Sequence, residues 1–174
     1  MHLNVENTND VSADLYALSE NSNFVICSGA KSILDLSKTN ELLETLGITR
    51  IGYQTNYMPG FWYEETENKV DNKFDEIHEI SSFLKLNENM ENKKSILIFN
   101  KVPLEKALNK NDVEKWINNA TIKADRNNIS GKELTPFLIK EINEQSKNET
   151  LNANVSLIIN NANLAGKIAK SFYS

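Results

Sequence analysis

Lys31 is the residue whose place in the sequence points most directly to chemistry. It follows the apolar run Phe24–Cys27 and the small residues Ser28-Gly29-Ala30. A short apolar run ended by a glycine turn is typical of a strand buried on both faces, and ligands of open α/β sheets bind beyond the carboxyl ends of such strands. Burial there disfavours the ammonium form of a lysine, and an uncharged amine is a nucleophile for a sugar carbonyl. The spacing alone leaves open an ordinary lysine that binds a carboxylate or a helix end.

A second group of candidate residues, Asp10, Ser12 and Asp14, lies ahead of this run in an Asp-x-Ser-x-Asp pattern. Taken locally, the pattern favours the start of a helix, with Ser12 as the N-cap and Asp14 in the first turn.

The elements that must position these residues follow from the apolar pattern. Three short strands are predicted, at residues 23–28, 50–54 and 95–99, the first and last of them as apolar runs, and residues 55–72 form a long connection. Helices are predicted at 12–20, 39–46, 74–86, 111–127, from Pro136 with Thr135 as the cap, and 152–172 with Val155, Ile159, Ala162, Ile168 and Phe172 inward. Strands that alternate with helices form parallel units. We therefore expect an α/β fold of three layers, α/β/α, with a mostly parallel sheet.

Composition narrows the class of protein. The 174 residues carry a net charge of −5, which argues against a surface that binds nucleic acid through its phosphates. The single cysteine, Cys27, fits a reducing compartment and a buried structural role. No apolar run reaches the length of a membrane span, and the N-terminus lacks the pattern of a signal peptide. The sequence predicts a soluble protein of the cytoplasm, with an organelle left open.

Six blocks, in this order, resemble the pseudouridine-5'-phosphate glycosidase family. They are Asp10–Asp14, Val25–Asp35, Leu43–Gly47, Ile51–Thr55, Gly131–Leu138 and Asn160–Ala162. The resemblance covers nearly the whole chain but only the C-terminal half of the family. It implies that residues 1–174 are the C-terminal part of one such domain, an incomplete half. The missing N-terminal half carries the family's proton donor and a lysine that binds the substrate phosphate.

The resemblance also implies roles for individual residues. Lys31 corresponds to the covalent nucleophile, which forms an imine with the sugar, and Asp10 to the ligand of a Mn²⁺ or Mg²⁺ ion held largely through waters. Ser12, Asp14 and Asn154 correspond to substrate-binding positions, with Asn154 on the uracil ring. One departure weakens a phosphate-binding loop: His2-Leu3-Asn4 stands where the family tends to have His-Arg-Gly.

Two functions remain open from the sequence. The first is a glycosidase that splits pseudouridine 5'-phosphate into uracil and ribose 5-phosphate. The second is a catalytically incomplete fragment or split subunit that binds a partner half or a sugar phosphate. In either case we expect a homo-oligomer or a complex with the partner half, and no activity from the isolated chain.

Overall fold

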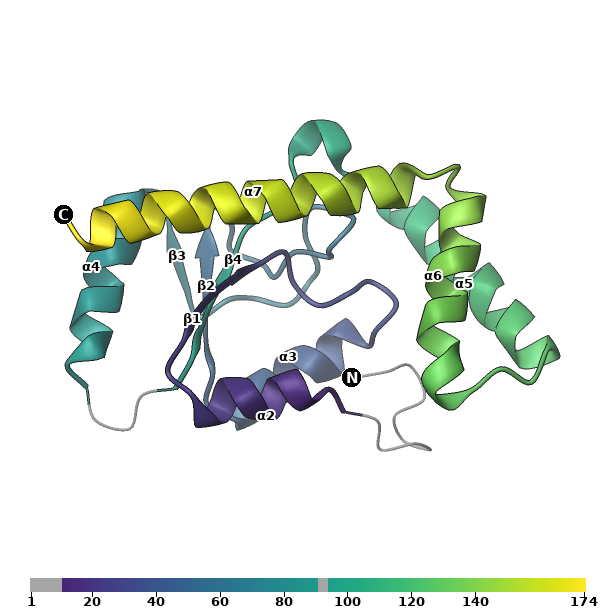
Figure 1. Cartoon of the computed structure of the whole chain (residues 1–174), viewed down its shortest axis with the longest axis horizontal. Coiled ribbons are helices and arrows are strands. Elements are labelled where there is room, and N and C mark those ends of the chain that lie inside the picture. The colour runs from purple at the N-terminus through teal and green to yellow at the C-terminus, as the bar shows by residue number, and fades with distance from the viewer. Residues whose placement is uncertain (1–10, 91–93) are drawn as a thin grey trace.

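A computed structural model describes residues 11–90 and 94–174 of the chain (Figure 1). Within these residues, four strands form one parallel sheet in the order β1-β4-β2-β3: β1 (Phe24–Cys27), β2 (Thr49–Tyr53), β3 (Asn72–Phe74) and β4 (Ile96–Phe99). The helices are α2 (Ala13–Glu20), α3 (Leu36–Thr45), α4 (Ile77–Glu88), α5 (Lys110–Arg126), α6 (Leu134–Gln145) and α7 (Glu149–Phe172), with short 3-10 turns at Leu104–Lys106 and Gly131–Glu133.

The sheet is the middle of three layers. Alternate strand residues on one face, such as Ile51, Ile96 and Ile98, pack beneath α4 and α7. Their neighbours on the other face, such as Leu97 and Phe99, pack against α2 and α3. Figure 1 shows α7 along one side of the sheet and α2 with α3 along the other. The predicted three-layer α/β/α fold with a parallel sheet is confirmed.

The remaining helices lie beside the sheet. α5 and α6 pack against each other and against the start of α7. Their shared core includes the buried residues Val113, Leu138 and Leu157, together with Trp62 from the connection between β2 and β3. This core ties that long connection, which follows the carboxyl end of β2, to the helical end of the molecule.

Three strands were predicted, and the described residues form a fourth, β3. It lies at the end of the predicted connection and includes Phe74, which the prediction assigned to a helix. An ion pair between buried Arg50 and the more exposed Asp71 holds the entry to β3. The Arg50 side chain donates to both carboxylate oxygens of Asp71 and to the side-chain and main-chain oxygens of Asn40. Asp71 in turn accepts from the Arg50 backbone at 2.7 Å. Such long-range pairing leaves no periodic signal in Asn72-Lys73-Phe74.

Three helix details also differ from the predictions. α3 begins three residues early because Asp35 caps it, accepting from the Lys38 backbone at 2.9 Å. Thr135 is not a cap: the 3-10 turn Gly131–Glu133 runs straight into α6, which begins at Leu134. In α7 the buried side chains are Thr150, Ala153, Leu157, Leu164 and Ile168, whereas Val155, Ile159 and Ala162, predicted to face inward, are exposed. The helix carries two apolar stripes, and the sheet covers the other one.

Candidate functional site

The carboxyl ends of β1 and β4 are held to α7 by a buried group of polar side chains. Ser28 follows β1, Asn100 follows β4, and Asn161 reaches them from α7. Asn161 donates to the Ser28 hydroxyl at 3.1 Å and accepts from the Asn100 amide at 3.0 Å. Ser28 and Asn100 are only 2% and 6% exposed. The network fixes the point at which the chain leaves the sheet toward Lys31.

A tight turn then directs the chain to Lys31. Gly29 has a φ of +84°, and a Cβ atom there would lie 2.1 Å from the carbonyl oxygen of Pro59. Only glycine suits both the left-handed backbone and this approach. The Phe61 backbone also donates to the Ser28 carbonyl at 3.1 Å. The turn and the connection after β2 therefore brace each other beside the predicted nucleophile.

Lys31 borders a cavity of about 650 Å³ that also takes in Ser12 and Asp14. The structure thus brings together three of the residues to which the sequence assigned a role. The Lys31 residue is exposed, so the dry strand mouth expected from the sequence is not present among the described residues.

Ser12 and Asp14 show the cap geometry expected from the local pattern. Ser12 is the N-cap of α2: its hydroxyl accepts from the Asp14 backbone at 3.3 Å and donates to the Asp14 carboxylate at 3.0 Å. The cap does not remove them from the cavity, because both still line its wall. Structural capping and contact with a ligand are therefore compatible here.

The cavity has two parts of different chemistry. Its polar side chains are those of Ser12, Asp14, Lys31 and Thr135, here called the rim, together with Asn23 and Thr39. Its floor is apolar and is made by side chains from the sheet, α2 and α3: Leu15, Leu18, Val25, Cys27, Leu43, Leu97 and Phe99. Burial raises the pKa of the Cys27 thiol to about 11, which disfavours the thiolate and makes the cysteine a poor nucleophile. Cys27 is half-buried and packs against the core below the sheet.

Asn154 does not line this cavity. It lies on α7, where its side-chain oxygen accepts from the indole nitrogen of buried Trp62 at 2.8 Å. This bond orients the amide and leaves its nitrogen as the group suited to donate to a ligand carbonyl.

Asp10, the predicted metal ligand, and His2, in the segment that differs from the family pattern, lie outside the described residues. Within residues 11–90 and 94–174, no group of three or more His, Cys, Asp and Glu side chains could enclose a metal ion. A cation held by one carboxylate and several waters does not require such a group, so the metal stays a prediction. In the same part of the chain, no helix has both the length and the apolar character of a membrane span.

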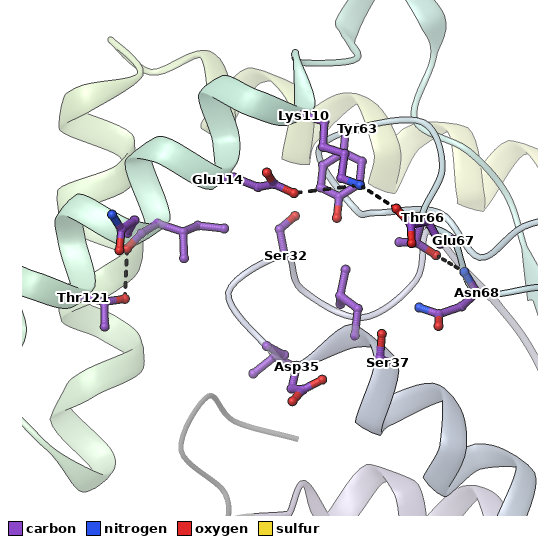
Figure 2. A pocket seen from close by; sticks show the side chains of 14 residues that line it. Ser32, Asp35, Ser37, Tyr63, Thr66, Glu67, Asn68, Lys110, Glu114 and Thr121 are labelled. Carbon is purple, nitrogen blue, oxygen red and sulfur yellow. Dashed lines mark hydrogen bonds and ion pairs between the residues drawn. The ribbon is translucent and has the colours of Figure 1, made fainter.

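A second cavity, of about 560 Å³, is lined by Ser32, the residue after Lys31 (Figure 2). Lys110 lies between Glu67 and Glu114, at 3.8 and 3.9 Å from their carboxylates, near the ring of Tyr63. Burial, with a smaller effect of the Glu114 charge, raises the pKa of the Tyr63 phenol. These charges already satisfy one another, and none of the residues predicted for the site lines this cavity.

Comparison with known proteins shows the family to which the chain belongs. The family model described as "Indigoidine synthase A like protein" matches residues 1–171. The chain belongs to the indigoidine synthase A-like family. Curated relatives named pseudouridine-5'-phosphate glycosidase include one from Petrotoga mobilis, 42% identical over 172 residues, and one from Staphylococcus aureus, 41% identical over 169 residues. The matches cover 99% and 97% of this chain but only 56% and 55% of the relatives.

Two solved structures of this family resemble the chain closely. The prealnumycin C-glycosynthase AlnA, in complex with ribulose 5-phosphate, superposes with a TM-score of 0.91 at 28% identity, over 98% of this chain and 56% of AlnA. An indigoidine synthase A-like protein from Thermotoga maritima gives a TM-score of 0.80 at 34% identity, over 92% of this chain and 53% of its own. The resemblance seen in the sequence is confirmed, and the chain spans about half the length of these relatives.

The sequence did not identify Asn100 and Asn161 as a unit. Asn161 lies in the matched block Asn160–Ala162, but one asparagine carries little information in a chain so rich in asparagine. Only the sheet topology, which places the end of β4 beside that of β1, reveals their connection through Ser28.

Proposed function

We propose that this family member contributes the nucleophile and part of the sugar site to a pseudouridine-5'-phosphate glycosidase. The observation that carries the proposal is the convergence of Lys31, Ser12 and Asp14 on one cavity that runs alongside β1 and reaches the turn after its carboxyl end. Relatives about 40% identical bear the glycosidase name, and a structural neighbour in complex with ribulose 5-phosphate supports a pentose phosphate as the ligand class.

In the proposed reaction the Lys31 amine attacks the anomeric carbon of the ribose, and the ring oxygen leaves that carbon. The nitrogen lone pair then forms the imine as the carbon–carbon bond to uracil breaks. The bond electrons go to the uracil carbon, which takes a proton, and water later hydrolyses the imine to release ribose 5-phosphate. Only an amine can supply this lone pair and end as an imine, which is why a lysine suits the position.

The other residues orient the substrate. Ser12 and Asp14, on the rim beside Lys31, are suited to bind sugar hydroxyls, and the Asn154 amide nitrogen to donate to a uracil carbonyl. A Mn²⁺ or Mg²⁺ ion, held by Asp10 largely through waters, would add positive charge near the phosphate.

The whole reaction requires groups that the resemblance assigns to the other half of the family. A proton donor is typically worth about 10²–10⁴-fold, and well-ordered positioning contributes about 7 kcal/mol or more in favourable cases. We therefore propose that the 174-residue chain alone releases no measurable uracil, and that a polypeptide carrying the family's N-terminal half restores turnover.

Imine trapping tests the nucleophile directly. The chain, with the complementing polypeptide present, is incubated with ribose 5-phosphate and borohydride, and modified lysines are mapped by peptide mass spectrometry. We expect the reduced adduct on Lys31, its loss in Lys31→Arg because a guanidinium forms no imine, and its persistence in the control Lys167→Arg on the exposed part of α7.

The same samples separate the glycosidase from the second candidate, an incomplete fragment that binds a sugar phosphate or a partner. The exposure of Lys31 favours this second candidate for the isolated chain. Trapping at Lys31 without uracil release from the complemented complex would support it. Labelling spread evenly over the lysines would contradict a specific role of Lys31, either as the nucleophile or in binding a sugar phosphate.

A further inference from the structure

β1 is an apolar strand at an uncovered edge of the sheet. In the described part of the chain it pairs with β4 on one side only. Its four residues, Phe24–Cys27, are all half-buried, whereas the equally apolar β4, paired on both sides, is fully buried. Even a short edge strand leaves backbone groups with which another strand can pair, and proteins commonly cover such edges. Here the edge lies directly beside the cavity of Lys31, to which Val25 and Cys27 contribute.

The floor of that cavity is not suited to a sugar phosphate. Leu18, Val25, Leu97 and the other floor residues supply only apolar side chains, and hydroxyl or phosphate groups placed among them would lose hydrogen bonds with water. An apolar cavity of about 150 Å³ already binds a molecule the size of benzene, and this one is several times larger. The floor therefore has room and chemistry for apolar side chains of another polypeptide segment.

The comparisons supply the identity of the segment. The matched residues make up 56% of the Petrotoga relative, so more than two fifths of that protein has no counterpart in this chain. We infer that the apolar floor and the open β1 edge form the docking surface for a polypeptide equivalent to that unmatched part. The inference rests on the proposed function, and it adds where the complementing polypeptide binds and how it excludes water from Lys31.

A competing surface makes the inference specific. The outer stripe of α7 exposes Leu151, Val155 and Ile158, the last with 63% of its surface accessible. Exposed apolar stripes of this kind also bind partners. However, α7 lies along one side of the sheet, whereas α2 and α3, which line the Lys31 cavity, lie along the other (Figure 1). A partner on the exposed stripe of α7 would therefore not cover that cavity. A variant on each surface distinguishes the two.

Cys27 provides the measurement, because it is the only cysteine of the chain and lines the cavity floor. The chain is labelled with a maleimide with and without the corresponding N-terminal segment of the Petrotoga relative, and the Cys27 peptide is quantified by mass spectrometry. Burial already makes the Cys27 thiol react slowly in the free chain. We expect labelling to slow by about a further tenfold or more when the segment binds, because a covered thiol reacts only after local opening.

The paired variants are Ala17→Glu, on an exposed position of α2 that lines the cavity, and Ile158→Glu on α7. Circular dichroism and thermal unfolding establish that both fold. We expect Ala17→Glu to abolish both protection of Cys27 and co-elution with the segment, and Ile158→Glu to leave both unchanged.

Several outcomes would overturn the inference: no binding of the segment, binding with unchanged labelling of Cys27, or loss of binding in Ile158→Glu alone. Protection that rises with the concentration of the chain without any added segment would identify a second copy as the occupant and contradict it as well. Failure of the proposed function gives a different result. The segment would still protect Cys27 from labelling, but uracil release and Lys31 trapping would both be absent.

Discussion

Removing Asn161 should cost the fold more than removing any exposed asparagine of the same helix. In Asn161→Ala, the buried Ser28 hydroxyl and Asn100 amide both lose their partner on α7. A buried polar group left unpaired costs about 1–3 kcal/mol, so two such groups give about 2–6 kcal/mol. The gain in helix propensity returns at most about 0.7 kcal/mol, and water entering the gap lowers the cost further. We expect a net loss of about 2–4 kcal/mol.

Urea denaturation followed by circular dichroism measures this loss, and Asn163→Ala is the matched control. Asn163 lies two residues further along α7 and is exposed, so its replacement brings the same propensity change without the network. We expect that control to stay within about 0.5 kcal/mol of the parent. A cycle with Ser28→Ala should give a coupling of about 0.5–3 kcal/mol. Equal losses in the two asparagine variants, or no coupling, would refute the view that the network holds the strand ends.

Three further predictions concern the turn, the thiol and the uracil position. Gly29→Ala should lower the unfolding free energy by more than about 2 kcal/mol, since it combines a positive φ with a backbone clash, while Gly166→Ala, with open space around it, should raise it by about 0.5–1 kcal/mol. Because burial raises the pKa of Cys27 from 9.0 to about 11, the unfolded thiol ionises first. Stability from this group is complete below pH 9 and declines as the pH rises toward 11, and Cys27→Ala should remove that decline in urea titrations at each pH. Asn154→Asp keeps the acceptor for Trp62 but loses the amide donor, so it should weaken uracil binding, measured by tryptophan fluorescence, far more than it changes the melting temperature.

The parts of the fold that the sequence predicted are those with local signals. β1 and β4 are apolar runs bounded by turns, β2 is a short segment between Gly47 and the long connection, and Ser12 caps α2 as its residue type indicates. β3 could not be predicted in this way, because its three residues are mostly polar and its position depends on the Arg50–Asp71 pair across 21 residues of sequence. The buried face of α7 was misassigned because the helix carries two apolar stripes and periodicity does not say which one the sheet covers.

The candidate site, like the fold, could be predicted from the sequence only in part. The resemblance brought Lys31, Ser12 and Asp14 into one hypothesis, and the structure places all three on one cavity. Their roles in catalysis stay predictions, as does the metal at Asp10. The surroundings of the lysine could not be read from the sequence: an apolar run followed by a glycine turn predicts a buried strand end, yet β1 lies at an edge and Lys31 is exposed.

This exposure suggests how the tasks of the site are divided. The buried Ser28 network and the Gly29 turn fix where the Lys31 backbone stands, and they do so with residues of this chain alone. Attack by an amine also needs a site from which water is excluded, because a solvated lysine keeps its proton and an imine in open water hydrolyses. The open β1 edge and apolar floor are where that exclusion is lacking. A covering polypeptide would therefore complete the fold and activate the lysine in the same step, so that folding of the complex and the chemistry are coupled.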